Sequence, residues 1–547
     1  MANQKHPTGL YFLFFAEMWE RFGYYLMIGI FVLYMTGDIA SGGLGFERAR
    51  ASDIYGTFIA FVFLTPFLGG LLADRKLGYR LSITIGGLSM GLGYALLAVP
   101  GEYSFIVALL LIIVGNGFFK PNISTLLGNL YNDEKYKDNK DSGYNIFYMG
   151  INIGAFVCNF FAAYLRNNFG WKYAFLAAGV GMFIGIIIFW TGNKHYVHAD
   201  IKKEVNKEDT PLSKIFLTII APAFGIGAVG WLIPGEIFGS DSTDAFIFGC
   251  MPVIYFYWNL YHKANAEDKR PIAALLAIFA VVIMFWAVFK QNGTALTTWA
   301  EYYTNREIPA RAEGFADALG MTQKIEYTKD TFDIMDYHFR KMTNPTGEFQ
   351  TAEVYPPFFN NYENKAELVD GKTYKFFSTE LFQSINPFFV VILTPVVVWF
   401  FSVLRRNKKE PTTPNKIAWG LVISTMSTTV MLSAVILTTN GQFKASPMWL
   451  ISSYAVITVG ELFLSPMGLS MVSKLSPPRL TALMMGGWFL STSIGNKLSG
   501  VLATTWDLYD DKTYYFAVNF VLLAISALMI FSMLKWLNQI FAEKLGK

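Results

Sequence analysis

Residues 10–35, "LYFLFFAEMWERFGYYLMIGIFVLYM", form an apolar segment long enough to cross a bilayer as one helix. Glu17, Glu20 and Arg21 stand in its middle, where each charge costs roughly 2.5–3.5 kcal/mol on insertion scales. Together with Tyr24 they follow the spacing i, i+3, i+4, i+7, so they share one helical face. This face is expected to point at a protein interior or an aqueous cavity. It is either part of a functional site or an ion network that only locks helix packing.

The rest of the chain repeats this apolar pattern. Of the 547 residues, 53% are hydrophobic and only 15% are charged. Runs of about 20 apolar residues favour a polytopic helical membrane protein over a β-barrel, whose segments alternate over about ten residues. We therefore predict an all-α fold with fourteen spans, near residues 10–36, 52–72, 81–100, 104–130, 142–166, 172–192, 213–234, 244–262, 271–299, 379–403, 415–438, 446–472, 480–505 and 513–540.

The orientation follows from the basic residues of the short loops. Lys and Arg gather in alternate loops, which marks those loops as cytoplasmic and places both termini in the cytoplasm. The polar N-terminus runs directly into a full-length span, so no removable signal peptide is expected. Cys158 and Cys250 both fall in apolar segments and are expected to be free, buried thiols.

Residues 300–378 are polar, rich in turn residues and without a spanning run. By parity this insertion lies outside the cell. Its aromatic stretch "EVYPPFFNNY", residues 353–362, indicates that it folds. Long loops are uncommon unless they are functional, but an insertion without any role in transport is the simpler interpretation.

A few polar residues occur at membrane depth. Basic groups on the first and fourth spans, with an acid on the twelfth, suggest a cavity for a zwitterion. The sequence lacks a phosphate-binding loop, a zinc motif, a nucleophile elbow and a nucleic-acid signature, so we expect no enzyme, metal or cofactor. The polar and aromatic candidates beyond the first span are Lys120, Asn152, Trp286, Lys290, Gln291, Asn386, Glu461, Trp488, Thr492 and Lys497.

Several motifs resemble those of known transporters. "GGLLADRKLGYR" at 69–80 is similar to the cytoplasmic signature of the major facilitator superfamily. Five further segments resemble motifs of the proton-coupled oligopeptide transporter family. They are "EMWERFGYY" at 17–25, "GNGFFKPNIS" at 115–124, "FYMGINIGAF" at 147–156, "FQSINP" at 382–387 and "GELFLSP" at 460–466. These motifs extend over nearly the whole chain in family order.

The resemblance implies two six-helix bundles, residues 1–192 and 266–545, which rock around a central site. Two extra helices within 193–265 link the bundles, and the 300–378 insertion interrupts the second one. The resemblance implies that no cofactor is needed, because a proton gradient drives transport in this family.

The resemblance also implies residue roles. Glu17 and Glu20 would couple proton movement to the carboxylate-binding Arg21, and Lys120 with Glu461 would close the cytoplasmic side as a salt bridge. A bound peptide would be held at its carboxylate by Arg21 and Lys120, at its amino end by Asn152, Asn386 and Glu461, and along its side chains by Tyr24, Tyr25, Trp286, Trp488 and Thr492, with Lys290 in the same cavity.

The sequence departs from the family pattern at three positions. Ile28 replaces an Arg, Lys290 replaces an acid that takes part in proton coupling, and Phe63 replaces a common Tyr. The outer ion pair between the first two positions therefore cannot form. Lys290 is expected to pair with Glu461 or with a substrate carboxylate, or to extend to the outer interface.

Arg48 and Glu301 lie near outer helix ends. They would offer a substitute for the lost outer ion pair, although two solvated charges are the simpler interpretation.

The resemblance implies a proton-coupled symporter that imports di- and tripeptides across the cytoplasmic membrane, with small peptides, protons and lipid as its partners, no nucleic acid, and a monomeric state. One alternative is a family member that moves another small zwitterionic or anionic solute. A second alternative is a membrane-anchored binding module that uses the insertion. The sequence leaves peptide preference and proton stoichiometry open.

Overall fold

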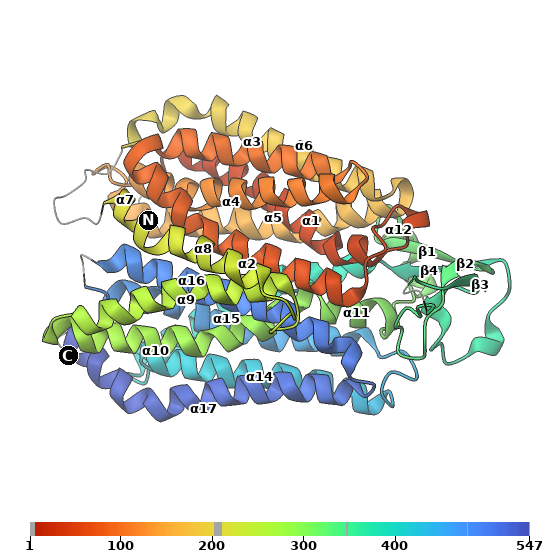
Figure 1. Ribbon diagram of the computed structural model, residues 1–547. Coiled ribbons are helices and arrows are strands. Elements are labelled where there is room, and N and C mark those ends of the chain that lie inside the picture. The colour runs from red at the N-terminus through yellow and green to blue at the C-terminus, as the bar shows by residue number, and fades with distance from the viewer. Residues whose placement is uncertain (1–5, 202–210, 346–347, 478–479, 546–547) are drawn as a thin grey trace.

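The computed structural model describes residues 6–201, 211–345, 348–477 and 480–545. Long helices run side by side, and both termini lie at the end opposite the small strands of the insertion (Figure 1). Helices occupy each of the fourteen predicted spans: α1 Gly9–Thr36, α2 Arg48–Leu72, α3 Tyr79–Leu97, α4 Glu102–Leu130, α5 Lys140–Phe169, α6 Trp171–Thr191, α7 Leu212–Ile215 continuing to α8 Ala221–Leu232, α9 Asp241–Lys263, α10 Ala266–Phe289 continuing to α11 Ala295–Tyr302, α13 Ile385–Arg406, α14 Thr413–Leu437, α15 Pro447–Leu475, α16 Thr481–Thr504 and α17 Lys512–Leu545.

By length and composition alone, eleven helices of the described residues could cross a membrane. The helices α1, α9 and α16 are not among them. For α1 the reason is plain, since Glu17, Glu20 and Arg21 interrupt its apolar run. The predicted all-α, multi-pass membrane fold is confirmed, and α1 is the helix whose polar face calls for a protein neighbour.

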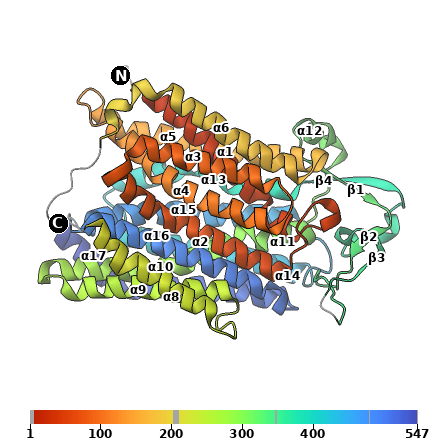
Figure 2. The same ribbon diagram turned by 45° about the horizontal axis from the view of Figure 1, so that its top comes forward.

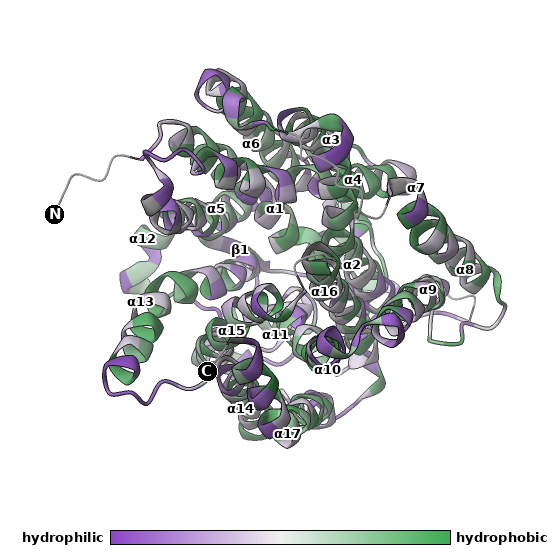
Figure 3. Cartoon of the chain, turned by 90° about the vertical axis from the view of Figure 1, so that its left-hand side faces the viewer, coloured by the Kyte–Doolittle hydropathy of each residue, from purple (hydrophilic) through white to green (hydrophobic). Residues whose placement is uncertain are grey.

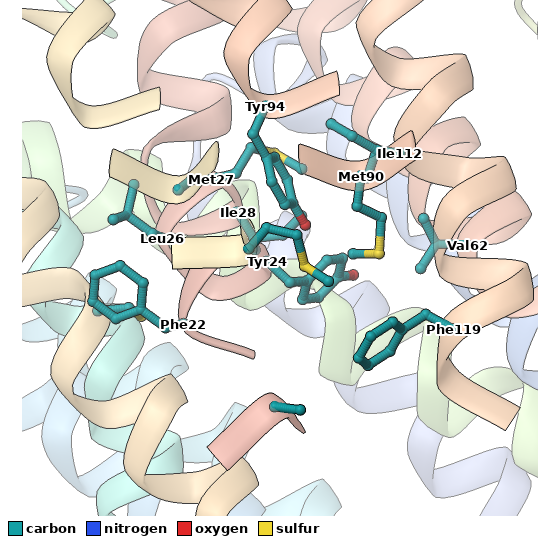
Figure 4. Close-up of a cluster of buried hydrophobic side chains, with 14 of the residues drawn as sticks. Phe22, Tyr24, Leu26, Met27, Ile28, Val62, Met90, Tyr94, Ile112 and Phe119 are labelled. Carbon is teal, nitrogen blue, oxygen red and sulfur yellow. The ribbon is translucent and has the colours of Figure 1, made fainter. Parts of the chain in front are cut away.

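Helices α1 to α6 share one hydrophobic core. In it α3 packs on α4 and α6, and α1 packs on α5 and α6. Figure 4 shows Tyr94, Met90 and Phe119 gathered around Tyr24 in this core. A second core lies among α10, α14, α15, α16 and α17. The end view in Figure 3 shows the two groups of helices on opposite sides of the molecule. Helix α2 of the first group packs against α16 of the second.

The hairpin of α8 and α9 lies along the outside of the bundle, beside α10 and α2 (Figure 2). Few of its large apolar side chains are buried, as expected for helices that face lipid. At its turn, however, Asp244 is fully buried and accepts hydrogen bonds from the backbone N–H groups of Ile237 and Phe238.

The span predicted as one run over 271–299 is broken. Helix α10 ends at Phe289, a short 3₁₀ turn covers Lys290–Gly293, and α11 begins at Ala295. The carbonyl of Asn292, freed at this break, accepts a hydrogen bond from Gln383 Nε2 at 2.6 Å. Irregular backbone at membrane depth is tolerated where neighbouring side chains satisfy it, as here.

The insertion is folded, as its aromatic content predicted. Helical structure extends to Tyr302 and resumes at Thr379, so the insertion is slightly shorter than predicted. Phe358, Phe359 and Phe376 form its small core. It contains α12 Glu313–Ala318 and two antiparallel pairs, β1 Thr322–Tyr327 with β4 Lys372–Phe377 and β2 Asp330–Asp333 with β3 Thr351–Val354. The two cysteines are free and buried, which confirms that prediction.

Candidate functional site

The charged residues of α1 form one buried cluster. Arg21 Nε lies 3.1 Å from Glu17 Oε1, and the guanidinium also pairs with both carboxylate oxygens of Glu20. All three side chains are at most 5% exposed. Two carboxylates share one guanidinium, so the cluster carries one negative charge unless a proton or another cation balances it. Lys120 of α4 is close enough for its charge to act on both carboxylates.

Lys120 lies near the same aromatic ring as Lys290, a lysine of the other half of the molecule. Its ammonium lies 4.2 Å from the centroid of the Phe63 ring on α2, and the ammonium of Lys290 lies 5.2 Å from the same centroid. Lys290 further contacts the rings of Trp286 and Phe289, at 5.8 and 5.5 Å. Phe63, one of the three departures, thus lies close to one lysine from each half.

In the second half, an amide and a carboxylate form a pair. Asn386 Nδ2 of α13 donates to Glu461 Oε2 of α15 at 3.1 Å and to Thr458 Oγ1 at 2.9 Å. The charge of Glu461 acts on Lys290, but no ion pair within 4.0 Å joins them in the described residues. The predicted ion pair between Lys290 and Glu461 is therefore not formed in this conformation.

The aromatic candidates flank these charges. Arg21 lies 5.6 Å from the Tyr24 ring centroid, and Tyr24 packs edge-to-face on Tyr25. Trp286 is buried next to Lys290, and its indole N–H has no hydrogen-bond partner in the described part of the chain.

Thr492 and Asn152 each donate to a carbonyl of their own helix. Thr492 is buried and donates to the Trp488 carbonyl, and Trp488 packs edge-to-face on Phe279 in the second core. Asn152 is partly exposed and donates to the Tyr148 carbonyl on α5.

At the insertion end, the two halves are joined by ion pairs that the sequence alone did not reveal. Arg48 lies 2.5 Å from Asp507, so the interpretation of Arg48 as a solvated charge is wrong. Glu301 is likewise paired, with Arg306 at 3.4 Å. Arg166 of α5 pairs with the buried Glu380 at 3.2 Å.

A further ion pair joins α2 to α16. Lys497 Nζ donates to Asp53 Oδ1 at 2.5 Å and to Ser242 Oγ of the α8–α9 hairpin at 2.8 Å. The sequence indicates Lys497 as a candidate but carries no signal for its partner, Asp53.

The ion pair predicted to close the cytoplasmic side is not formed in this structure. No ion pair within 4.0 Å joins Lys120 to Glu461 in the described residues. Ion pairs join the two halves at the insertion end, and the Lys120–Glu461 gate stays a prediction. The described residues contain no group of three or more His, Cys, Asp or Glu that could hold a metal ion.

Comparison with known proteins shows which family this chain belongs to. The model of the POT family matches residues 80–315 and 366–518, which is more than half of the chain. The chain belongs to the POT family. This POT protein is 28% identical to a di-/tripeptide transporter of Lactococcus lactis over 94% of the chain and 92% of the relative. It is 27% identical to dipeptide and tripeptide permease A of Escherichia coli, over 93% and 86%.

A crystal structure of a peptide transporter POT in complex with sulfate superposes with a TM-score of 0.76 at 28% identity, covering 99% of this chain and 97% of that one. The family predicted from the motifs is therefore confirmed, and the chain is a transporter and not an enzyme. Within this POT protein, Ile28 is buried and Lys290 stands at the break after α10, so both departures lie in the membrane part of the fold.

Proposed function

We propose that this POT protein is a proton-driven symporter that imports di- and tripeptides across the cytoplasmic membrane. Its bundles, residues 1–192 and 266–545, would rock as two bodies, with 193–265 as linker helices and both termini in the cytoplasm. The protein would act as a monomer in the bilayer. The named di-/tripeptide transporters among its relatives support this substrate class.

One observation carries the proposal: each half contributes a polar group, and the two groups are complementary in charge. Arg21 and Lys120 are cationic and suit a peptide carboxylate. The Asn386–Glu461 pair, joined at 3.1 Å, offers acceptor oxygens to a peptide ammonium group. Tyr24, Tyr25 and Trp286 supply walls that accept varied side chains without specific hydrogen bonds.

The α1 cluster provides the means of proton coupling. Glu17 Oε2 is buried and has no hydrogen-bond partner in the described residues, so it is free to take a proton. Protonation would weaken the hold of Glu17 on Arg21 and release the guanidinium toward the substrate carboxylate. Proton binding and peptide binding would then favour each other, which is what symport requires.

Uptake of labelled dialanine into proteoliposomes tests the proposal. An inward acid gradient should drive accumulation above equilibrium, and collapsing the gradient with a protonophore should abolish it. Uptake that is unaffected by the gradient would contradict proton coupling. Absence of peptide uptake, with transport of another small zwitterion or anion instead, would favour the alternative substrate class that the Lys290 departure raises.

A further inference from the structure

Two lysines from opposite halves lie against one phenylalanine ring. The ammonium groups of Lys120 and Lys290 are 4.2 and 5.2 Å from the Phe63 centroid, so their separation is at most the sum of these distances. The face of an aromatic ring attracts a cation, but it does not neutralise the charge. Phe63 has no hydroxyl group that would occupy the space with its own hydrogen bond.

No carboxylate of the described residues lies within 4.0 Å of either ammonium group. Glu17 and Glu20 form ion pairs with Arg21, and Glu461 accepts a hydrogen bond from Asn386. Two like charges that are partly removed from water repel each other and lose hydration. An anion placed between them would relieve both costs.

A third donor lies beside Lys290. The Trp286 side chain is 8% exposed, its ring is 5.8 Å from the Lys290 ammonium, and its indole N–H has no acceptor in the described residues. A buried N–H without an acceptor costs free energy that a bound ligand can recover. Two ammonium groups and one N–H donor are a donor set suited to a carboxylate.

We propose that Lys290, with Lys120 at the same Phe63 ring and the Trp286 N–H beside it, forms a subsite for a second carboxylate on the substrate. This POT protein would then select small peptides with an acidic side chain. The inference rests on the proposed peptide transport. Lys120 is shared: with Arg21 it serves the main-chain carboxylate, and with Lys290 it serves the carboxylate of the side chain.

The test compares two peptides of nearly equal size that differ by one charge, Ala-Glu and Ala-Gln. Their affinities for the purified full-length protein are measured by titration calorimetry in detergent. Wild type should bind Ala-Glu at least about tenfold more tightly, a ratio that corresponds to about 1.4 kcal/mol. Lys290→Gln should remove this ratio, whereas Lys290→Arg should keep much of it.

Lys329→Gln is the matched control. Lys329 is exposed on the insertion, and its ammonium also lies over an aromatic ring, that of Tyr355, at 5.7 Å. This variant should retain the wild-type ratio. Lys290→Met serves as a second neutral variant if Lys290→Gln does not fold, since its unbranched side chain is nearly as long.

The inference is overturned if wild type binds both peptides equally, or if the preference for Ala-Glu survives the neutral variants. If dialanine is still taken up, the proposed peptide transport stands even when either of these results overturns the inference. Free glutarate distinguishes the source of the carboxylate. If glutarate binds in a Lys290-dependent way while dialanine is neither bound nor transported, the proposed peptide transport fails and the anion subsite stands.

Discussion

Arg48 at the start of α2 donates to Asp507, which lies just after α16, over 2.5 Å, and the same guanidinium donates to the Phe339 carbonyl of the insertion over 2.8 Å. One side chain therefore joins the first half, the second half and the insertion. The insertion adds its own contacts to the two halves, since Lys341 lies 3.3 Å from Asp38 and Arg340 lies 2.9 Å from Asp510. Opening this end of the transporter requires these contacts to separate.

Arg48→Ala should raise the population that is open at the insertion end. Arg48 and Asp507 are only 12% and 22% exposed, so leaving one unpaired costs about 1–3 kcal/mol. Spin labels at the exposed Glu47 and Leu508 would report the opening as a longer distance. The control is Arg50→Ala, because the Arg50–Glu102 pair is about half exposed and lies within the first half. Equal distance distributions in wild type and Arg48→Ala would contradict this role.

Docking of the insertion should depend on pH through Asp38. Burial, followed by a hydrogen bond with Asp333, raises the pKa of the Asp38 carboxyl group. A group whose pKa is raised in the docked state binds its proton more tightly there than when the insertion moves away. Acid therefore favours docking, and this contribution is lost as the pH rises through the raised pKa.

Spin labels at the exposed Ser41 and Lys329 would measure this docking in acidic and in neutral buffer. The docked fraction should fall as the pH rises in wild type. Asp38→Asn, which mimics the protonated form, should stay docked at both pH values. The same pH dependence in Asp38→Asn would assign the effect to another group.

Glu17→Gln or Glu20→Gln should abolish uptake driven by the proton gradient, because an amide cannot carry the proton that frees Arg21. Counterflow exchange needs no net proton movement and should continue. Both activities can be measured in the same proteoliposomes with labelled dialanine. Glu102→Gln, an exposed carboxylate on α4, should behave as wild type. Accumulation by Glu20→Gln at the wild-type level would remove this residue from the coupling mechanism.

Lys120→Ala should weaken dipeptide binding by at least about tenfold, the effect of losing a charged contact of about 1.4 kcal/mol. A dipeptide amide, which lacks the carboxylate, should bind wild type poorly and should lose little in the variant. Competition against labelled dialanine gives both affinities. If the dipeptide and its amide inhibit equally, Lys120 does not hold the main-chain carboxylate.

Lys497→Met should destabilise the protein by about 3–5 kcal/mol, because it removes the cation from the Asp53 carboxylate, which is only 16% exposed. Adding Asp53→Asn should recover part of that loss, since the two residues are coupled. Unfolding midpoints in detergent measure both effects. Additive losses in the double variant would show that the 2.5 Å contact contributes nothing as a pair.

The fold class and the α1 cluster follow from the sequence alone. Apolar runs of about 20 residues leave a helix as the only way to satisfy the backbone in lipid. The spacing of Glu17 and Arg21 brings them to 3.1 Å because both belong to one helix, whose geometry is fixed by its period. The family motifs also predict the order of the helices and the candidate residues at membrane depth.

Only the tertiary structure decided which charges from different helices meet. Arg48 and Asp507 are 459 positions apart, and Lys497 and Asp53 are 444 apart, so no local pattern relates them. Likewise, Phe63 lies within 5.2 Å of both Lys120 and Lys290 because α2 lies where the two halves join. Helix periodicity sets the face on which a side chain lies, but the partner across that face depends on how whole helices pack.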